Sequence, residues 1–153
     1  MVKKDINQAK WDKRFVEMTQ LVATWSSCLR RQVGAVIVKD RRVLGIGYNG
    51  APAGIKSCKE RNECIRNQYG IKSGENREMC YAVCAEQNAI LEAGKSRTGI
   101  AGSTMYCSLT PCTTCAKLII NAGIIRLVCL EKYPDQLSLK LLKEAGIEVE
   151  FYN

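Results

Sequence analysis

The feature that most constrains the fold of this chain is a regular alternation of strand and helix patterns over residues 84–151. Three short apolar runs are typical of buried strands, at residues 103–109, 124–130 and 147–151. Three helical patterns precede or separate them, at residues 84–94, 112–122 and 137–145. Each helix closes at a glycine that suits a left-handed cap, namely Gly94, Gly123 or Gly146. Strands joined by single helices pair in parallel through right-handed crossovers, so a parallel three-stranded unit is predicted.

The first half of the chain adds a helix and a hairpin. Apolar residues recur at helical spacing from Trp11, which predicts a helix over residues 10–26. The apolar runs at residues 33–38 and 43–48 flank the charged stretch KDRR and predict an antiparallel hairpin. Together with the parallel unit, these elements predict an α/β fold: a three-layer sandwich with a five-stranded mixed sheet and helices on both faces.

Length and composition indicate one globular domain. At 153 residues the chain can bury its own hydrophobic core, and we expect a single domain over residues 1–153. Its 46% hydrophobic and 25% charged residues are ordinary for a globular protein and exclude wholesale disorder. Residues 49–77 are rich in Gly, Lys, Asn and Ser, and predict a long, mostly irregular excursion. Long loops in compact domains are usually functional.

Charge and hydropathy indicate the kind of partner. The net charge of +8 favours anionic partners such as nucleotides, nucleic acid or lipid headgroups. Residues 1–15 lack the apolar core and cleavage site of a signal peptide, and no run approaches the ~18 apolar residues that cross a bilayer. We therefore expect a soluble, cytoplasmic protein with no membrane partner.

The chain has nine cysteines and no histidine, so any metal chemistry must use sulfur and oxygen. An odd number of cysteines without a secretion signal argues against a disulfide framework. The plain alternative is that single cysteines are small buried hydrophobes.

Two cysteine motifs carry the strongest chemical signal. Cys84 stands two residues before Glu86 at the head of a predicted helix, and TPCTTC places Cys112 and Cys115 at the head of the next, with Pro111 in its first turn. If the two helix N-termini meet, the three thiols can bind one zinc ion and leave a fourth position open for water, as in catalytic zinc sites. Glu86 is then the carboxylate that moves protons, and not a ligand. A Cys-x-x-Cys pair alone would also fit a redox pair or half of a structural zinc site.

Zinc base deaminases combine three such ligands, a Glu and a P-C-x-x-C motif. The sequence resembles the cytidine and deoxycytidylate deaminase superfamily, and within it the deoxycytidylate (dCMP) branch. The resemblance runs through WDKRF, CLRRQVGAVIV, GYNGAPAG, CAEQNAIL and PCTTCAKLIINAGIIRLV, and GYNGAPAG is typical of that branch. It implies a cytidine-deaminase-like fold and zinc-dependent hydrolytic deamination of dCMP to dUMP and ammonia. One departure is Cys84, a position at which most members of that branch carry His. Deaminases of free nucleosides carry Cys there and usually have an Arg directly after the Glu, whereas this chain has Gln87.

The resemblance also implies roles for residues around the substrate. Asn49 would bond the sugar hydroxyls, and Tyr133 would lie near the base. The residues that would wall the pyrimidine are Val33, Gly34, Ala35 and the Ala85 backbone. Arg30 and Arg31 are candidates for the phosphate. Each role has a plain alternative: a turn for Asn49, a half-exposed aromatic for Tyr133, and a solvated charge pair for the two arginines.

A second cysteine set lies before the first strand and in or just after the excursion: Cys28, Cys58, Cys64 and Cys80. The resemblance implies that this set binds a second, structural zinc, with Cys64 as the fourth ligand of an all-sulfur site. A metal would order a polar loop that has little core of its own. Cys107 and Cys129 fall in predicted strands and are expected in the core.

The resemblance further implies a homo-oligomer, typically a hexamer, regulated by dCTP and dTTP, with Mg²⁺ accompanying a triphosphate effector. Three other functions compete: a deaminase of free cytidine or deoxycytidine, a deaminase of cytosine or adenine in single-stranded nucleic acid, and a non-catalytic zinc-binding module. The positive charge suits nucleic acid, but only 7% of residues are aromatic, which argues against base-stacking surfaces. Glu86 argues against a purely structural metal site.

Overall fold

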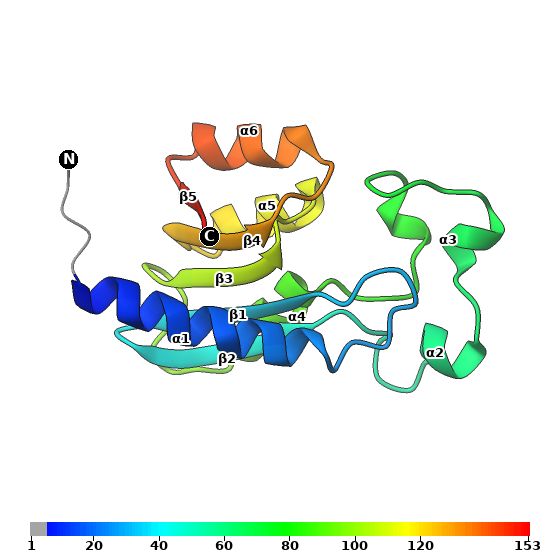
Figure 1. Cartoon of the computed structure of the whole chain (residues 1–153), viewed down its shortest axis with the longest axis horizontal. Coiled ribbons are helices and arrows are strands. Elements are labelled where there is room, and N and C mark those ends of the chain that lie inside the picture. Colours follow the sequence, from blue (N-terminus) through cyan, green and yellow to red (C-terminus); the bar gives the residue numbers. More distant parts are fainter. Residues whose placement is uncertain (1–5) are drawn as a thin grey trace.

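The computed structural model describes residues 6–153, and within them five strands form one mixed sheet in the order β2-β1-β3-β4-β5 (Figure 1). The strands are β1 (Gly34–Lys39), β2 (Arg42–Tyr48), β3 (Thr104–Leu109), β4 (Arg126–Glu131) and β5 (Glu148–Phe151). β1 pairs antiparallel with β2 and β3, whereas β3, β4 and β5 are parallel. The predicted hairpin, parallel unit and five-stranded mixed sheet are therefore confirmed.

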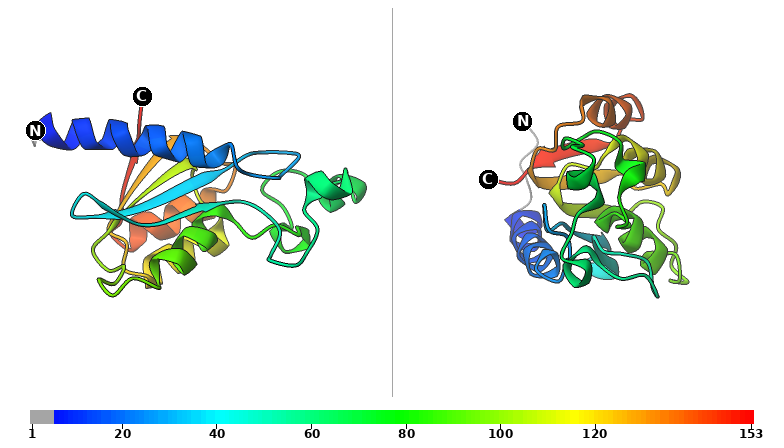
Figure 2. Two further views of the ribbon diagram at one scale, coloured as in Figure 1. Left: turned by 90° about the horizontal axis from the view of Figure 1, so that it is seen from below. Right: turned by 90° about the vertical axis from the view of Figure 1, so that its right-hand side faces the viewer.

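Helices cover both faces of this sheet, as predicted. The longer ones are α1 (Ile6–Ala23), α4 (Ala85–Ala93), α5 (Thr113–Asn121) and α6 (Gln136–Glu144). α1 packs on β1 and β3 from one side, while α4 packs on β2 and β1 from the other, where α5 and α6 lie against each other (Figure 2). The molecule is thus a three-layer sandwich.

The larger core lies between the sheet and the α4–α6 layer. Its fully buried apolar side chains include Ile37, Met105, Ile119, Leu127 and Leu142. Cys107 and Cys129 are paired across β3 and β4 in this core and are almost fully buried, which agrees with their predicted placement.

A buried ionic network ties α1 to the sheet, on the face opposite the α4–α6 layer. Asp12 accepts hydrogen bonds from Tyr106 Oη at 2.6 Å and from Arg126 Nη2 at 2.8 Å. Arg126 also donates to Glu150 at 3.1 Å, so one guanidinium joins two carboxylates. Burial alone would raise the pKa of Asp12, but the bonds from Arg126 and Tyr106 lower it to about 2.

On the other side, β2 and α4 approach each other closely because β2 carries glycine at alternate positions. A Cβ on Gly45 would lie 2.6 Å from Ala89 O, and one on Gly47 would lie 2.2 Å from Ala85 O. Only glycine lets the backbone of α4 come this near to the strand.

Most predicted boundaries hold to within a few residues, and three details differ. α1 begins at Ile6 and ends at Ala23, ahead of the predicted span. Gly123 and Gly146 are left-handed with φ of 79° and 78°, but Gly94 has a φ of −62° and continues the helical conformation. α5 begins at Thr113 with Cys112 as its N-cap, so Pro111 precedes the helix and does not lie in its first turn.

The excursion after β2 is mostly irregular, as predicted. It contains two single-turn helices, α2 (Cys58–Arg61) and α3 (Ile65–Gln68), and the 3₁₀ turn η1 (Arg77–Met79). It projects beyond the carboxyl ends of the parallel strands (Figure 1), which is the edge where α/β sheets place their ligands. No helix in residues 6–153 is long and apolar enough to span a bilayer.

Candidate active site

Three thiols meet where the N-termini of α4 and α5 come together. The Sγ atoms of Cys84, Cys112 and Cys115 all lie within 4.8 Å of one another. Cys84 is the N-cap of α4, Cys112 is the N-cap of α5, and Cys115 follows within the first turn of α5. The two helix dipoles and their free N–H groups favour negative charge at this point, which suits thiolates.

Oxygen-bearing side chains help to cap these two helices. Gln87 Oε1 accepts a hydrogen bond from the backbone N–H of Cys84 at 3.0 Å. Asp135 Oδ2 accepts one from the backbone N–H of Thr113 at 2.7 Å. Gln87 therefore has a structural task at the position that follows Glu86.

The three thiols share their protons unevenly. The pKa of Cys112 is lowered because the Cys115 and Cys84 thiols form hydrogen bonds with its sulfur, and the same bonds to Cys112 raise the pKa of Cys84 to about 11 and raise that of Cys115. Arg77 Nη2 adds a hydrogen bond to Cys84 Sγ at 3.1 Å. Three soft sulfur donors at these separations fit zinc, and three protein ligands leave room for a fourth, exchangeable one.

Glu86 is the second residue of α4, and it is 5% exposed. Burial raises its pKa to about 7, the negative charge of Cys112 acts in the same direction, and Arg77 opposes both. A carboxyl with this pKa can both accept and release a proton near neutral pH.

The pocket that contains Glu86 includes most, but not all, of the residues expected around a substrate. Val33, Asn49, Ala85 and Tyr133 line it together with Cys84 and Cys112. Gly34 and Ala35 are not among its lining residues. They lie in β1, where Gly34 N donates to Ser108 Oγ at 3.0 Å and Ala35 is fully buried.

Asn49 ties two parts of the pocket wall together. Its Oδ1 accepts from Val33 N at 2.9 Å, and its Nδ2 donates to Arg31 O at 2.8 Å. An amide oxygen has a second lone pair and an amide nitrogen a second hydrogen. Asn49 thus holds the wall in place. Its Oδ1 can still accept one further hydrogen bond, and its Nδ2 can still donate one.

Tyr133 is 7% exposed, so it is not a half-exposed aromatic. Its backbone N–H donates to Thr110 Oγ1, and its hydroxyl accepts from Gly74 N at 2.8 Å. This last bond docks the end of the excursion onto the rim of the pocket.

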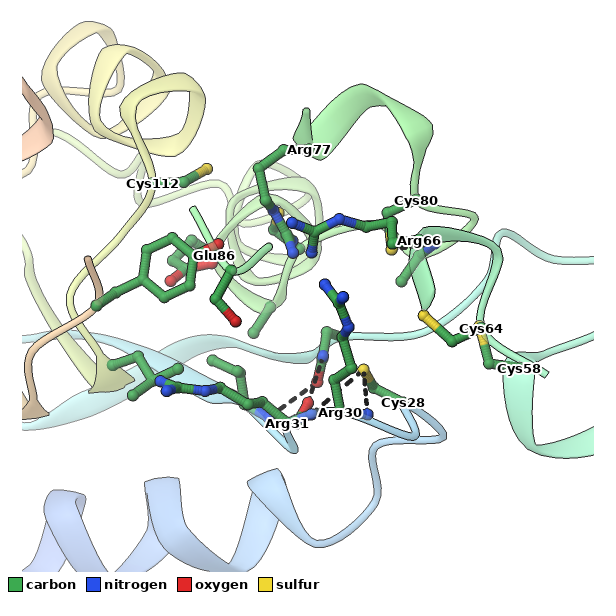
Figure 3. A pocket seen from close by; sticks show the side chains of 18 of the residues that line it. Cys28, Arg30, Arg31, Cys58, Cys64, Arg66, Arg77, Cys80, Glu86 and Cys112 are labelled. Carbon is green, nitrogen blue, oxygen red and sulfur yellow. Dashed lines mark hydrogen bonds between the residues drawn. The ribbon is translucent and has the colours of Figure 1, made fainter. Parts of the chain in front are cut away.

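Four arginines line the same pocket, and only two of them are suggested by sequence. Arg30 is half-buried and donates to Asn67 Oδ1 at 2.6 Å, whereas Arg31 is exposed. Arg66 and Arg77 come from the excursion, and their guanidinium groups point toward the centre of the pocket (Figure 3). Arg30 Nη1, Arg66 Nε and Arg77 Nε are buried without a hydrogen-bond partner. No local spacing marks these two loop arginines, because the chain between them is irregular.

The second cysteine set lines the outer end of this pocket, but among the described residues no three of its sulfurs lie within 4.8 Å of one another, unlike those of Cys84, Cys112 and Cys115. Cys28, Cys58, Cys64 and Cys80 all line it (Figure 3), and none forms a disulfide. Burial raises the pKa of Cys58, and the nearby sulfurs of Cys80, Cys64 and Cys28 raise it further. Backbone N–H groups point at two of the sulfurs: Arg30 N at 3.4 Å from Cys28 Sγ, and Ala82 N at 3.4 Å from Cys80 Sγ.

Comparison with known sequences identifies relatives over nearly the whole chain. The sequence model of the cytidine and deoxycytidylate deaminase zinc-binding region matches residues 9–131. The deoxycytidylate deaminase of Saccharomyces cerevisiae is 40% identical over 144 residues, which cover 94% of this chain and 45% of the yeast protein. The chain thus spans less than half the length of that relative. The deoxycytidylate deaminase of Mycobacterium phage D29 is 41% identical over 136 residues, which cover 86% of this chain and 99% of the phage protein.

Comparison with solved structures agrees. The dCMP deaminase of cyanophage S-TIM5, solved in complex with dCMP and dUMP, superposes with a TM-score of 0.78 at 29% identity, covering 99% of this chain and 100% of that one. The thiol cluster and the buried glutamate lie within the segment that the zinc-binding sequence model matches. On these grounds, the chain belongs to the cytidine and deoxycytidylate deaminase family.

Proposed function

We propose that this chain is a zinc-dependent dCMP deaminase, which converts dCMP and water to dUMP and ammonia. The observation that carries the proposal is the buried carboxyl of Glu86 in one pocket with Cys84 and Cys112, two of three clustered thiols. A buried acid is costly, and a site that only held a metal would have no use for it. Family membership and the names of the relatives support the reaction and the nucleotide.

The residues of the pocket divide the chemistry between them. Cys84, Cys112 and Cys115 would hold zinc, which when bound lowers the pKa of water so that its oxygen can attack C4 of cytosine near neutral pH. Glu86 takes the proton that the water releases and passes it to N3 of the ring. It then carries the proton of the new C4 hydroxyl to the amino group, which leaves as ammonia.

The walls of the pocket would orient the cytidine moiety. Val33, Ala85 and Tyr133 offer apolar surface to the pyrimidine, and Asn49 has one donor and one acceptor left for the sugar hydroxyls. Gly34 and Ala35 follow Val33 in the chain, at the start of β1, and do not line the pocket.

The phosphate would be bound by arginine. Arg30 and Arg31 line the pocket, and Arg66 joins them from the excursion. A buried N–H without a partner is costly, and charge-assisted bonds to phosphate are strong, so the free nitrogens of Arg30 and Arg66 support an anionic ligand. This favours a nucleotide over a free nucleoside even though Cys84 is the ligand typical of nucleoside deaminases.

The second cysteine set would bind a structural zinc. Support comes from four free sulfurs at one end of the pocket and from the N–H groups directed at Cys28 and Cys80, which stabilise thiolates. The short helices α2 and α3 are too small to order the excursion by themselves. A metal there would hold the arginine-bearing loop against the pocket.

The chain would assemble as a homo-oligomer, with a hexamer expected from the family. Leu91 on α4 is 66% exposed and Leu118 on α5 is 41% exposed, which supports an apolar contact on this layer. Regulation by dCTP and dTTP, with Mg²⁺ bound to the triphosphate, is proposed on the resemblance alone. Native mass spectrometry with and without these nucleotides tests both points.

The role of Glu86 is tested by Glu86→Gln, which keeps the size of the side chain but cannot cycle a proton. We expect full zinc content, a native melting temperature and a loss of kcat of ~10²–10⁴ or more. Glu92→Gln is the matched control, because Glu92 lies near the exposed end of the same helix and should retain activity. Loss of zinc in Glu86→Gln would make Glu86 a ligand, and retained activity would refute the mechanism.

The substrate is tested by comparing kcat/KM for dCMP, deoxycytidine and a single-stranded oligonucleotide. Recognition of the phosphate predicts a strong preference for dCMP over deoxycytidine. Equal values would assign the chain to nucleoside deaminases, and turnover confined to oligonucleotides with steep salt dependence would assign it to nucleic acid editing. Metal analysis should give about two zinc ions per chain, falling to one in Cys58→Ser.

A further inference from the structure

The three thiols of the cluster would give a bound metal site an unfavourable negative charge. Three thiolates around a divalent zinc ion leave a net charge of about −1. Cys112 and Cys115 are buried and Cys84 is largely so, and an uncompensated charge is expensive in such a place. The chain contains no histidine, so no neutral imidazole ligand is available to lower the negative charge.

Arg77 lies where a compensating charge is needed. It begins the 3₁₀ turn η1 in the excursion, and its Nη2 donates to Cys84 Sγ at 3.1 Å. Burial would lower the pKa of Arg77, but the Cys84 sulfur beside it keeps the pKa above its ordinary value. A guanidinium remains charged at every pH at which proteins fold, so this is a permanent positive charge at the metal site.

Two other arginines of the pocket, the buried Arg66 and the half-buried Arg30, direct one nitrogen each at backbone carbonyls, and among the described residues no bond joins either to the thiol cluster. Arg66 Nη2 donates to the carbonyl oxygens of Lys72 and Glu75, and Arg30 Nη2 donates to that of Ile71. Within residues 6–153, the cation that donates a hydrogen bond to a sulfur of this cluster is Arg77.

We propose that Arg77 is the counter-charge of the metal site, and that the chain needs it because position 84 is a cysteine and not a neutral ligand. This inference rests on zinc at Cys84, Cys112 and Cys115 as proposed above. Arg77 acts through Cys84 and so is a positioning residue, not a catalytic one. It removes the excess negative charge that three sulfurs would otherwise place beside Glu86 and the substrate.

Arg77 comes from a segment that is bonded to Tyr133 and that ends at Cys80, a member of the second cysteine set. Cys80 follows Arg77 by three residues, directly after η1. Gly74, on the other side of Arg77, donates to the Tyr133 hydroxyl, and a Cβ at Gly74 would lie 2.6 Å from Pro134 O. The backbone just before Arg77 is thus anchored to Tyr133 and packed closely on Pro134.

The test is a double-mutant cycle between Arg77 and Cys84, read out by zinc retention against a competing chelator. The Cys115→Ser variant should lack the zinc ion of this cluster, so the difference in zinc content between it and the unsubstituted protein identifies that ion. Arg77→Gln should weaken retention of that pool by ~10–100-fold, as removal of a hydrogen-bond partner of a metal ligand typically does. Arg77→Lys keeps the charge without the fork of donors and should restore part of the loss.

The decisive comparison is in the Cys84→His background, where the ligand set has one negative charge fewer. There Arg77→Gln should change zinc retention by less than ~3-fold, since the two effects are coupled. Lys72→Gln, which removes an exposed charge from the same loop, is the control and should match the unsubstituted protein. Melting temperatures and circular dichroism establish that each variant folds.

Two outcomes would overturn the inference. One is unchanged zinc retention in Arg77→Gln. The other is an equal loss in the unsubstituted and Cys84→His backgrounds, which would give Arg77 only a structural role. If the Cys84→His variant does not bind zinc, the Arg77→Lys variant decides the question. A role for the charge is also refuted if Arg77→Lys retains zinc no better than Arg77→Gln does. If zinc retention depends on Arg77 and Cys84 jointly, as expected, but dCMP is not converted, the inference stands and the proposed reaction is refuted.

Discussion

Replacing Gly47 with alanine should damage stability and activity together, because Gly47 is where β2 touches the helix that carries Cys84 and Glu86. A Cβ at this position would lie 2.2 Å from Ala85 O, where ordinary contacts begin at 3.4 Å, a shortfall of 1.2 Å. The same Cβ would lie 2.4 Å from Ala89 N, so backbone atoms on two turns of α4 oppose it. Neither can rotate away, and the helix must retreat as a body.

The magnitude follows from this geometry. Overpacking that shifts backbone costs about 1–3 kcal/mol, and a clash with two backbone atoms belongs at the upper end. The reduced entropy of the unfolded chain returns about 0.4–1 kcal/mol. The net loss in free energy of unfolding is then about 2 kcal/mol, or a fall in Tm of about 4–8 °C. A displacement of ~1 Å at Ala85, next to Glu86, should also reduce kcat/KM by ~10²-fold.

Urea unfolding and steady-state kinetics on dCMP measure the two effects. Gly50→Ala is the control for stability, because its Cβ would meet Ser27 Oγ at 3.6 Å, which is an ordinary contact. Its free energy of unfolding should stay within about 0.5 kcal/mol of the parent. A Gly47→Ala protein with parental stability and activity would show that α4 does not approach β2 as closely as described.

The remaining predictions concern the ionic network on α1 and the rim of the pocket. The pKa of Asp12 falls from 3.8 to about 2 in the fold, so its ionised form contributes about 2 kcal/mol to stability above pH ~4, and this is lost as the pH falls through about 2. Asp12→Asn should therefore destabilise the protein at pH 7 and much less at pH 2, and a penalty independent of pH in urea unfolding would contradict this. Tyr133→Phe removes the acceptor for Gly74 N and should cost about 1 kcal/mol. The amide of Gly74 should then exchange its hydrogen faster, and unchanged exchange would mean that this bond does not hold the loop.

The local sequence anticipated much of the fold because the relevant signals are short-range. Apolar periods of two and 3.6 residues, together with helix-ending glycines, located the strands and the longer helices to within a few residues. The errors fall where a local signal has more than one outcome. Gly94 ends a helix without turning left-handed, and Pro111 lies before the N-cap of α5 and not after it.

The candidate site was anticipated in part. Cys84, Cys112, Cys115 and Glu86 were predicted to share one site because each motif marks a helix N-terminus, and two such ends meet at one edge of a parallel sheet. Arg77 was missed although it is only seven residues from Cys84. The chain between them is irregular, so no periodicity indicates that the two side chains touch.

By itself, the sequence determined the order of elements and the parallel unit, and it predicted which three thiols come together and which acid lies beside them. The tertiary structure decided which residues surround them: Asn49 is bonded to the wall of its own pocket, Gly34 and Ala35 do not line that pocket, and members of both cysteine sets do. It also decided which cation faces the thiols. The physical reason is range: periodicity and capping act within one or two turns, whereas the position of a loop is set by contacts such as Gly74 with Tyr133, which only the closed fold brings together.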